Sequence, residues 1–311
     1  MYLTICPNTA LDKIFFIDEW IPGTPMRTNR FARSAGGKGL NSAVVLRHLG
    51  METTSIGFFA GSVGEELVEI LEGYGINIYP VWVGGTTREA HVIADQKNNI
   101  HSHVIAGEMV VSKAHSKVFI AHFINLLDKA ESIIFAGSIP ESLGPGLYSE
   151  LIPLAKAKGI LTLVDAQKDV MKESIKAKPD IVKMNRDEFG WTFNKPVAAL
   201  EKVIDEAIAF HDAHKLKNLV ITMSEDGTLA VTHKGVFLSK APRQKPVNAA
   251  GAGDAVSSSL AVKLQEGKSW EESLRFASAV GAAAVLTEGT GDVLMEDVNR
   301  IYPDVKVEKI S

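Results

Sequence analysis

The chain has 311 residues, 46% of them hydrophobic and 23% charged, which provides enough apolar material for a large core and excludes a disordered or fibrous protein. A formal net charge of −4, from 33 Lys and Arg against 37 Asp and Glu, predicts no nucleic-acid partner, so an anionic ligand must meet local cations or backbone amides. The single cysteine, Cys6, excludes an internal disulfide, and the lack of a signal-peptide pattern or of about 18 consecutive apolar residues predicts a cytoplasmic protein with no membrane partner.

Strand and helix patterns alternate along most of the chain. Short apolar runs predict strands, and apolar residues at three- and four-residue spacing predict helices. The expected strands are 3–6, 53–59, 76–83, 132–136, 160–164, 180–184 and 218–222, and the expected helices are 40–49, 65–71, 118–129, 147–158, 198–215 and 271–286, with one more beginning at Asp254. This alternation predicts an α/β fold with a mostly parallel, doubly wound sheet that has helices on both faces. Ser269 and Glu272 have the spacing of a capping box at the start of helix 271–286.

Two segments interrupt the alternation. Residues 88–95 and 100–105 are extended runs joined by 96–99, which is a hairpin pattern. A hairpin cannot join a parallel sheet, so we expect segment 86–106 to pack with the other irregular segment, 11–34, as a small β-sheet lid. Residues 28–34 are polar and are expected to be exposed. The apolar lid residues Ile14, Phe16 and Val92 are expected to be exposed too, and to pair with a second copy in a homodimer.

A small-residue loop, Gly251-Ala252-Gly253, runs directly into the helix that carries Asp254. Small residues let a backbone come close to a ligand, and the first N–H groups and dipole of the helix favour a phosphoryl group there. A carboxylate beside such an anion site repels phosphate, but it is well placed to take a proton from a hydroxyl that attacks one. The alternative is that Asp254 only caps the helix.

A second glycine-rich turn, Gly36-Gly37-Lys38-Gly39, leads into the helix that carries Asn41. Its spacing fits neither a Walker A motif nor the dinucleotide fingerprint, and an ordinary strand-to-helix turn is the alternative. Gly251-Ala252-Gly253 resembles half of a dinucleotide fingerprint. A nicotinamide dehydrogenase is therefore a rival interpretation, but that turn lies too near the end of the chain to leave room for a complete dinucleotide-binding half.

Together the two turns, the lid segments and Asp254 resemble the PfkB family of carbohydrate kinases, which have the ribokinase-like fold. Residues 35–43 are similar to the N-terminal motif of that family, and Gly251 to Asp254 match its Gly-Ala-Gly-Asp motif. The resemblance covers essentially the whole chain, which implies a single domain, 1–311. It also implies that Asp254 is the catalytic base and that Gly251, Ala252 and Gly253 form the anion hole.

Within the family, residues 8–12 resemble the opening of the 1-phosphofructokinase and tagatose-6-phosphate kinase branch, with Thr9 in place of proline. Thr87-Arg88 resembles the pair with which that branch holds the substrate phosphate, and the loop at 136–140 resembles its Ser-Gly-Ser-Leu-Pro loop. The substrate-binding residues that the resemblance implies are Asp12, Arg27, Gly36, Gly37, Lys38, Asn41, Arg88 and Ser138. A solvated surface charge is the alternative for any arginine taken alone, and a plain turn is the alternative for the Ser138 loop.

Residues 183–188 are similar to the family's Lys-Pro-Asn-x-x-Glu, with Met184 in place of proline. The resemblance implies that Asn185 and Glu188 act on Mg²⁺ indirectly, through water, although favourable acidic residues at a helix N-terminus would give the same pattern. The implied ATP-binding residues are Lys183, Asn185, Ser224, Gly227, Gly251 and Gly253. Glu225 and Asp226 depart from the family's glycine-rich nucleotide loop. Residues 277–291 either flank the adenine or form a close-packed core helix.

The sequence therefore predicts an ATP- and Mg²⁺-dependent kinase that phosphorylates a ketohexose phosphate, with fructose 1-phosphate preferred over tagatose 6-phosphate. A kinase for another sugar and a non-catalytic sugar-phosphate sensor are further alternatives. Asp254, Asn185 and Glu188 argue against the sensor, because a protein that only binds sugar phosphate needs neither a base nor a metal site.

Overall fold

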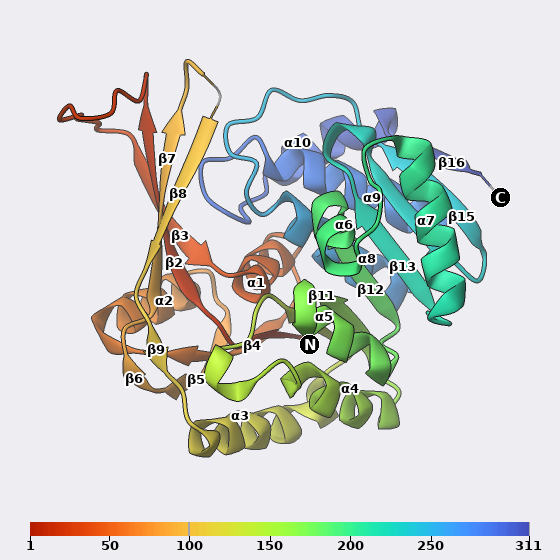
Figure 1. Ribbon diagram of the computed structural model, residues 1–311, viewed down its shortest axis with the longest axis horizontal. Coiled ribbons are helices and arrows are strands. Elements are labelled where there is room, and N and C mark those ends of the chain that lie inside the picture. Colours follow the sequence, from red (N-terminus) through yellow and green to blue (C-terminus); the bar gives the residue numbers. More distant parts are fainter. Residues whose placement is uncertain (99, 311) are drawn as a thin grey trace.

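The computed structural model describes residues 1–98 and 100–310, and within them a ten-stranded sheet runs through the molecule (Figure 1). The strand order is β16-β15-β14-β13-β12-β11-β10-β1-β4-β5. The strands are β1 (Tyr2–Cys6), β4 (Thr53–Phe59), β5 (Asn77–Trp82), β10 (Ser132–Ala136), β11 (Leu161–Asp165), β12 (Ile181–Asn185), β13 (Asn218–Thr222), β14 (Thr228–Thr232), β15 (Gly235–Lys240) and β16 (Lys306–Lys309). The sheet is parallel from β5 to β13, and β14 to β16 are antiparallel, so the expected mostly parallel sheet is confirmed.

Helices cover both faces of this sheet, as expected. On one face, apolar residues of α3 (Lys113–Leu126), α4 (Leu147–Ala157), α5 (Lys168–Ser174), α6 (Arg186–Phe193) and α7 (Leu200–Ala213) join a single buried cluster. On the other face lie α1 (Lys38–His48), α2 (Gly61–Gly73), α8 (Ala252–Gln265) and α9 (Trp270–Ala284), with α10 (Met295–Ile301) packed on α9. The central strands are buried along their whole length, because a parallel sheet has both faces covered. Within the described part of the chain no helix is long and apolar enough to cross a membrane.

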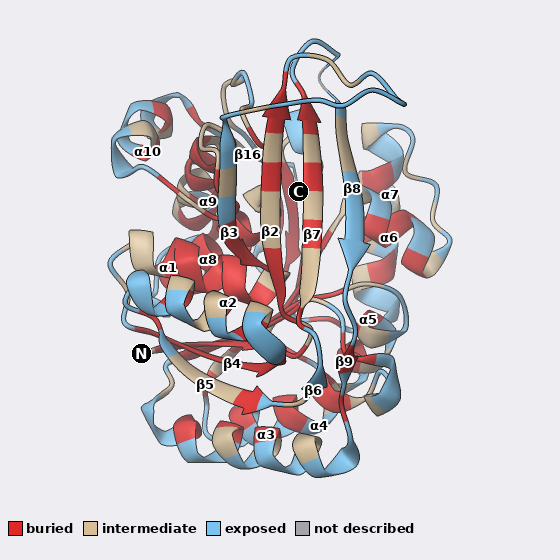
Figure 2. Cartoon of the chain, turned by 90° about the vertical axis from the view of Figure 1, so that its left-hand side faces the viewer, coloured by how far each residue is buried: buried red, intermediate tan, exposed pale blue. Residues whose placement is uncertain are grey.

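A separate four-stranded sheet, which we call the lid, stands at one side of the molecule (Figures 1 and 2). Its order is β3 (Phe31–Gly36), β2 (Ala10–Ile17), β7 (Arg88–Asp95) and β8 (Ile100–Ala106). The expected hairpin is β7 and β8, and β7 pairs in parallel with β2, which unites the two irregular segments of the sequence. Asn99, in the expected turn of this hairpin, lies outside the described residues. A pair of two-residue strands, β6 (Gly84–Gly85) and β9 (Met109–Val110), joins the chain at the base of the lid.

The structure of the lid contradicts two of the predictions made from the sequence. Residues 28–34 are not all exposed, because β3 begins at Phe31 and Ser34 is fully buried. The predicted exposed apolar face was wrong: Ile14, Phe16 and Val92 are only 1%, 3% and 4% exposed. They form a small cluster that the same chain covers, since Val247 packs against it and the Arg30 guanidinium lies 4.5 Å from the centre of the Phe16 ring.

The predicted capping box at the start of α9 is only half present. The Ser269 hydroxyl accepts a hydrogen bond from the Glu272 N–H at 3.1 Å. The Glu272 carboxylate binds the Lys268 ammonium at 3.1 Å, which draws it away from the N-cap backbone. The local pattern therefore identified the helix start correctly, while a neighbouring charge took the second bond.

Candidate active site

Asp254 lies in the first turn of α8, buried to 5% exposure. The N-cap residue is Gly251, in the left-handed conformation with φ 84°, and the Asp254 carboxylate makes no capping bond; its Oδ2 accepts a hydrogen bond from Asn41 Nδ2 at 2.8 Å. Capping therefore does not explain this carboxylate. Burial, followed by the charge of Asp165, raises the pKa of Asp254 to about 7. A carboxyl group with that pKa can accept a proton near neutral pH.

The two glycines beside Asp254 are required by close approaches. A Cβ on Gly251 would lie 2.8 Å from the Gly291 nitrogen, and a Cβ on Gly253 would lie 2.7 Å from Lys183 Nζ. An ammonium group therefore stands next to the first amides of α8. Both features favour a negatively charged group at this helix start.

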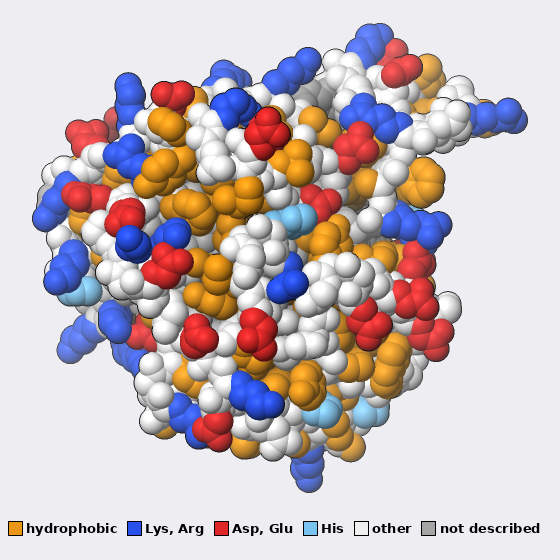
Figure 3. Space-filling model, turned by 180° about the vertical axis from the view of Figure 1, so that it is seen from behind, with side chains coloured by type: hydrophobic (Ala, Val, Ile, Leu, Met, Phe, Trp, Pro, Cys, Tyr) orange, Lys and Arg blue, Asp and Glu red, His pale blue; other side chains and the backbone are white. Residues whose placement is uncertain are grey.

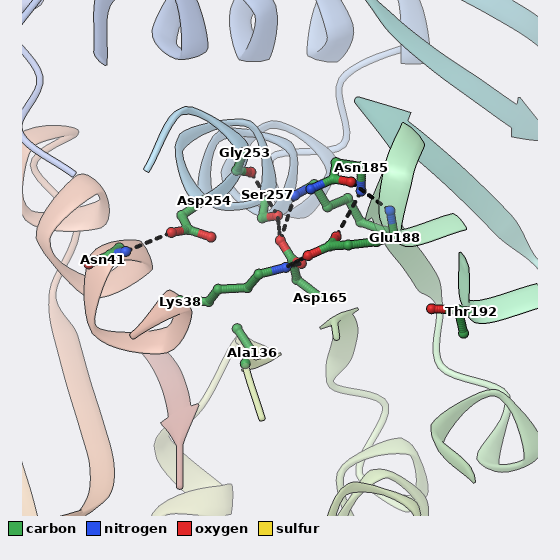
Figure 4. A network of polar contacts seen from close by, with 12 residues as sticks. Lys38, Asn41, Ala136, Asp165, Asn185, Glu188, Thr192, Gly253, Asp254 and Ser257 are labelled. Carbon is green, nitrogen blue, oxygen red and sulfur yellow. Dashed lines mark hydrogen bonds and ion pairs between the residues drawn. The ribbon is translucent and has the colours of Figure 1, made fainter. Parts of the chain in front are cut away.

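Asp165, which sequence reasoning missed, is the centre of the polar network in Figure 4. It is the last residue of β11 and is fully buried. Its carboxylate binds Lys38 Nζ at 2.6 Å and Lys183 Nζ at 2.7 Å, and it accepts a hydrogen bond from the Ser257 hydroxyl at 2.9 Å. Burial alone would raise the pKa of Asp165, but the two lysines lower it to about 2. A carboxylate directly after a predicted parallel strand was the available signal, because such strand ends line ligand sites.

Asn185 and Glu188 form a capping box at the start of α6. The Asn185 side chain accepts a bond from the Glu188 N–H at 2.8 Å, and the Glu188 carboxylate accepts one from the Asn185 N–H at 2.9 Å. The other Glu188 oxygen binds Lys38 at 2.7 Å. Among residues 1–98 and 100–310, no three His, Cys, Asp or Glu side chains converge as a metal site. Since both Glu188 oxygens are already occupied, this pair suits contact with a metal ion through water more than direct coordination.

The expected sugar side of the site is a cavity of about 150 Å³. Its lining residues are Asn8, Gly37, Lys38, Arg88, Gly137, Ser138, Ala166 and Gln167. The Arg88 guanidinium donates to the Asn8 carbonyl at 2.7 Å, and Asn8 Nδ2 donates to the Ser138 hydroxyl at 2.9 Å. Burial lowers the pKa of Arg88 below its usual value, and its buried Nε has no hydrogen-bond partner within the described residues.

Asp12 lies at the base of the lid, beside the first glycine turn. A Cβ on Gly36 would lie 2.2 Å from Asp12 Oδ1, so a larger residue there would displace the Asp12 carboxylate. Burial, together with the negative charge of Asp254, raises the pKa of Asp12 to about 7. The Thr290 side chain lies close enough to Asp12 to lower that pKa, and Asn41 Oδ1 is buried without a partner in the part of the chain that the structure describes. Thr290 carried no signal in the sequence, because it reaches the site only through the fold.

Three of the predicted residues lie apart from these groups. Arg27 is exposed in the loop between β2 and β3, at the upper left of Figure 1. Strand register places Ala10 opposite Arg88 and Ile17 opposite Asp95, so this loop extends from the lid end remote from Arg88, and the expectation that Arg27 shares its cleft is not met. Ser224 and Gly227 lie beyond β13, and Gly227 packs so closely on the Ser239 carbonyl of β15 that a Cβ would overlap it. Their contact with ATP stays a prediction.

The two acidic residues of that loop are neutralised by neighbouring arginines. Asp226 forms an ion pair with Arg186, the first residue of α6, and the Glu225 carboxylate lies 3.3 Å from the Arg243 guanidinium. The departure from a glycine-rich loop therefore adds no net charge locally. Lys38 lines the sugar-side cavity, but Asp165 and Glu188 bind its ammonium group. Lys38 therefore also belongs to the expected nucleotide side of the site, where Lys183, Asn185 and Glu188 lie.

The fold agrees with the comparisons to known proteins. The chain is 25% identical over 312 residues to a tagatose-6-phosphate kinase of Staphylococcus epidermidis and 24% identical over 310 residues to a 1-phosphofructokinase of Bacillus subtilis, covering 100% of both chains in each case. Among solved structures, a possible 1-phosphofructokinase from Thermotoga maritima superposes with a TM-score of 0.88 at 24% identity, covering 100% of this chain and 99% of that one. Phosphofructokinase-2 from Escherichia coli, in complex with substrates and products, gives 0.86 at 23% identity, with coverage of 97% and 98%.

These structural matches show the same fold. The family match is more specific: residues 9–297 match the pfkB family of carbohydrate kinases, and this range includes both glycine turns, Asp165 and Asp254. The chain therefore belongs to the pfkB family of carbohydrate kinases and is a phosphotransferase that acts on a sugar hydroxyl.

Proposed function

We propose that residues 1–311 act as one kinase domain that transfers the γ-phosphoryl group of ATP to a hydroxyl of a ketohexose phosphate. Fructose 1-phosphate is the preferred substrate, and tagatose 6-phosphate is the alternative. The full-length relatives named 1-phosphofructokinase and tagatose-6-phosphate kinase support this substrate class. D-tagatose-1-phosphate kinase of Klebsiella oxytoca, 27% identical over 293 residues, belongs to the same chemical class.

The observation that carries the proposal is the half-buried Arg88 guanidinium, whose Nε is fully buried. It lines the sugar-side cavity with an unpartnered Nε, among the described residues, and no carboxylate binds it. A guanidinium left in this state is suited to a phosphate dianion, which can accept two parallel N–H bonds. A free sugar offers no charge that would offset the burial of this cation.

The chemistry follows from Asp254 and the start of α8. In its ionised form Asp254 takes the proton of the attacking sugar hydroxyl, and Asn41 holds the carboxylate in place. The amides of Gly251 to Gly253, the helix dipole and Lys183 stabilise the negative charge that develops on the transferred group. When bound with ATP, Mg²⁺ supplies charge neutralisation at the phosphates. The Glu188 and Asn185 capping box would hold it through water.

A coupled assay of ADP release tests the substrate class. The panel contains fructose 1-phosphate, tagatose 6-phosphate, fructose 6-phosphate, fructose and ribose. We expect kcat/KM for one of the ketohexose phosphates to exceed that for either free sugar by at least about 100-fold, because the phosphate contacts Arg88. Equal turnover of free fructose would exclude the proposal, and absence of ATP turnover with every compound would favour the sugar-phosphate sensor.

We also propose that the protein forms a homodimer through the lid, by a different face from the one first expected. Ile14, Phe16 and Val92 are covered by the chain itself, but the opposite face carries Phe31 and Val104, which are 53% and 55% exposed. Phosphofructokinase-2 from Escherichia coli has a form described as tetrameric and inhibited, so assembly occurs among relatives of this fold. Light scattering at micromolar concentration should give the dimer mass, and Val104→Asp should lower it to that of the monomer.

A further inference from the structure

The segment between α9 and α10, residues 285–294, connects the lid to the catalytic helix. The Thr290 N–H donates to the Ser34 hydroxyl of β3 at 3.1 Å, in a buried position. Two residues earlier, the Glu288 carboxylate binds the Arg30 guanidinium at 2.6 Å, and the Arg30 guanidinium also lies over the Phe16 ring. The segment is therefore attached to the lid by two contacts.

At the centre of this segment, the Gly291 backbone packs closely against two residues of the active site, Asn41 and Gly251. Its φ is +82°, and a Cβ on it would lie 2.9 Å from the Asn41 carbonyl oxygen. On the other side, a Cβ on Gly251 would lie 2.8 Å from the Gly291 nitrogen. The backbone of Gly291 thus separates the residue that binds Asp254 from the N-cap of α8. Any shift of Gly291 must move at least one of them, because neither approach leaves free space.

The next residue, Asp292, holds this part of the segment in place through contacts of its side chain. Its Oδ1 accepts a hydrogen bond from the Tyr74 hydroxyl at 2.8 Å and lies 3.0 Å from His48 Nε2. Burial, and then the charge of Asp292, raise the pKa of Tyr74, so this hydroxyl stays protonated and remains a donor. The Asp292 carbonyl accepts a further bond from the Thr287 hydroxyl at 3.1 Å, which closes the segment on itself.

The two partners of Asp292 lie at the C-terminal ends of two helices, and one of these helices carries Asn41. His48 is the last residue of α1, the helix that carries Asn41 in its first turn, and Tyr74 is the C-cap residue of α2. Arg47 Nε donates to the Tyr74 carbonyl at 3.1 Å and joins these two helix ends. The segment therefore touches α1 at two points seven residues apart, about 10 Å along the axis. Two contacts fix the orientation of a connecting segment where one contact would leave it free to pivot.

We propose that Asp292 is a positioning residue for phosphoryl transfer. Its bonds to Tyr74 and His48 hold Gly291 against Asn41 and Gly251, and they thereby keep the Asp254 carboxylate aligned with the anion site at the start of α8. This role rests on the proposed kinase function. It assigns no contact between Asp292 and the substrates, so its loss should act on the transition state more than on binding.

The kinetic test compares Asp292→Ala with Asp292→Asn, which keeps an acceptor oxygen for the Tyr74 hydroxyl. Asp297→Ala is the matched control: it removes a carboxylate five residues away that pairs only with Arg300 within α10. We expect Asp292→Ala to lower kcat by about 10- to 100-fold, with the KM for the sugar phosphate within about threefold of wild type, because a displacement near 1 Å is sufficient for such a loss. Asp292→Asn should recover most of kcat, and the control should keep it.

Hydrogen–deuterium exchange gives a readout that needs no substrate. In Asp292→Ala, amides of residues 39–43 and 250–256 should exchange faster, while the strands of the large sheet keep their protection. A kcat within twofold of wild type would overturn the proposal. So would a loss that Asp292→Asn fails to rescue and that comes with faster exchange throughout the protein, since that result describes general destabilisation. If the wild type phosphorylates no sugar in the panel, the proposed function fails, and the local exchange pattern alone decides the role of Asp292.

Discussion

The two sides of the active site differ in how their buried charges are satisfied. On the expected nucleotide side, Lys38 and Lys183 share the Asp165 carboxylate, and Lys38 also binds Glu188. Every charge of this cluster has an opposite partner within 2.7 Å. In a low-dielectric interior such a network is rigid only when each member is paired, and here it is complete before any ligand binds.

On the sugar side, beneath the lid, several buried polar and charged groups lack such a partner. Burial raises the pKa of Asp12 to about 7, so its carboxyl group is partly neutral at physiological pH. Among the described residues, Arg88 Nε and Asn41 Oδ1 are buried with no partner. Buried polar atoms without partners are uncommon in folded proteins and imply a bound group or water that completes them. The ion network on the expected nucleotide side is thus complete within the fold, and we expect the substrate to complete the sugar side.

Elsewhere on the molecule, charges of both signs are interspersed, as on the face in Figure 3. Surface ion pairs of this kind contribute little stability individually. The two sides of the site are therefore the places where substitution should separate stability from catalysis most clearly.

The largest effect is expected at Asp254, where the two sides meet. Asp254→Asn should keep the hydrogen-bonded geometry with Asn41 and lower kcat by about 10²- to 10⁴-fold, because a positioned general base is lost. Thermal unfolding and ATP binding should change little. Retention of more than half of the wild-type rate would show that Asp254 is not the base.

Removing the Asp165 carboxylate, which Lys38 and Lys183 share, should disrupt the ion network on the nucleotide side. Asp165→Ala leaves the Lys38 and Lys183 ammonium groups without their common carboxylate, and the free energy of unfolding should fall by about 3–5 kcal/mol. On the sugar side, Asp12→Asn should change it by less than about 1 kcal/mol at pH 4, where the folded chain keeps the Asp12 carboxyl protonated. The pKa of Asp12 is raised from its ordinary 3.8 to about 7 in the folded chain, so its contribution to stability is fully present below pH 3.8 and is lost as the pH rises from there to about 7, and the Asn variant should be the more stable protein at pH 8. Denaturant titration measures all three proteins, and equal losses for both substitutions would remove the distinction between the two sides.

Arg88→Ala should act on the sugar phosphate alone. We expect binding of the sugar phosphate to weaken by about 2–4 kcal/mol, which corresponds to about 30- to 900-fold in KM, while the KM for ATP stays within about twofold. Arg27→Ala is the matched control, because Arg27 is exposed at the far end of the lid in this structure. If Arg27→Ala has the larger effect, the site is completed by a rearranged lid or by a second copy of the chain.

The raised pKa of Asp254 predicts a pH profile. Because the base must be ionised, kcat/KM should rise about tenfold between pH 6 and pH 8 and level off above the pKa near 7. Asp12 titrates in the same range, so the profile should be repeated with Asp12→Asn. If kcat/KM of the Asp12→Asn variant still rises with pH, the titrating group is Asp254. If the rise disappears in that variant, the titrating group is Asp12, on the sugar side.

The smallest effect is expected at Glu188. Glu188→Gln keeps an acceptor for the Asn185 N–H but removes the negative charge that faces Lys38, so the Mg²⁺ concentration for half-maximal activity should rise by about tenfold. Glu173→Gln is the control, because Glu173 is a partly exposed residue of α5 that pairs with Lys176, away from the site. An unchanged Mg²⁺ titration would leave Glu188 with a capping role only.

The sequence alone determined the alternating framework and the positions of the two glycine-rich turns. Strand runs of buried aliphatic residues, helix periodicity and glycine-rich turns are local patterns, and local patterns predict local structure. Gly37, Gly251 and Asp254 could be singled out because the reason for each residue, a positive φ or a charge at a helix start, is visible within a few neighbours. The hairpin 88–105 could be separated from the parallel sheet for the same reason.

Tertiary structure decided which side chains meet. Asp165 follows a predicted strand by one residue, yet only sheet order places it between Lys38 and Lys183, which are 145 positions apart in the sequence and come from two different elements. The burial of Ile14 and Phe16 depends on the loop at 241–250 that covers them, and the position of Arg27 depends on which end of β2 its loop leaves. The burial of a side chain, its pKa and the pairing of its charge all depend on neighbours that are distant in sequence. No local sequence pattern can therefore predict them, and only the packed chain decides them.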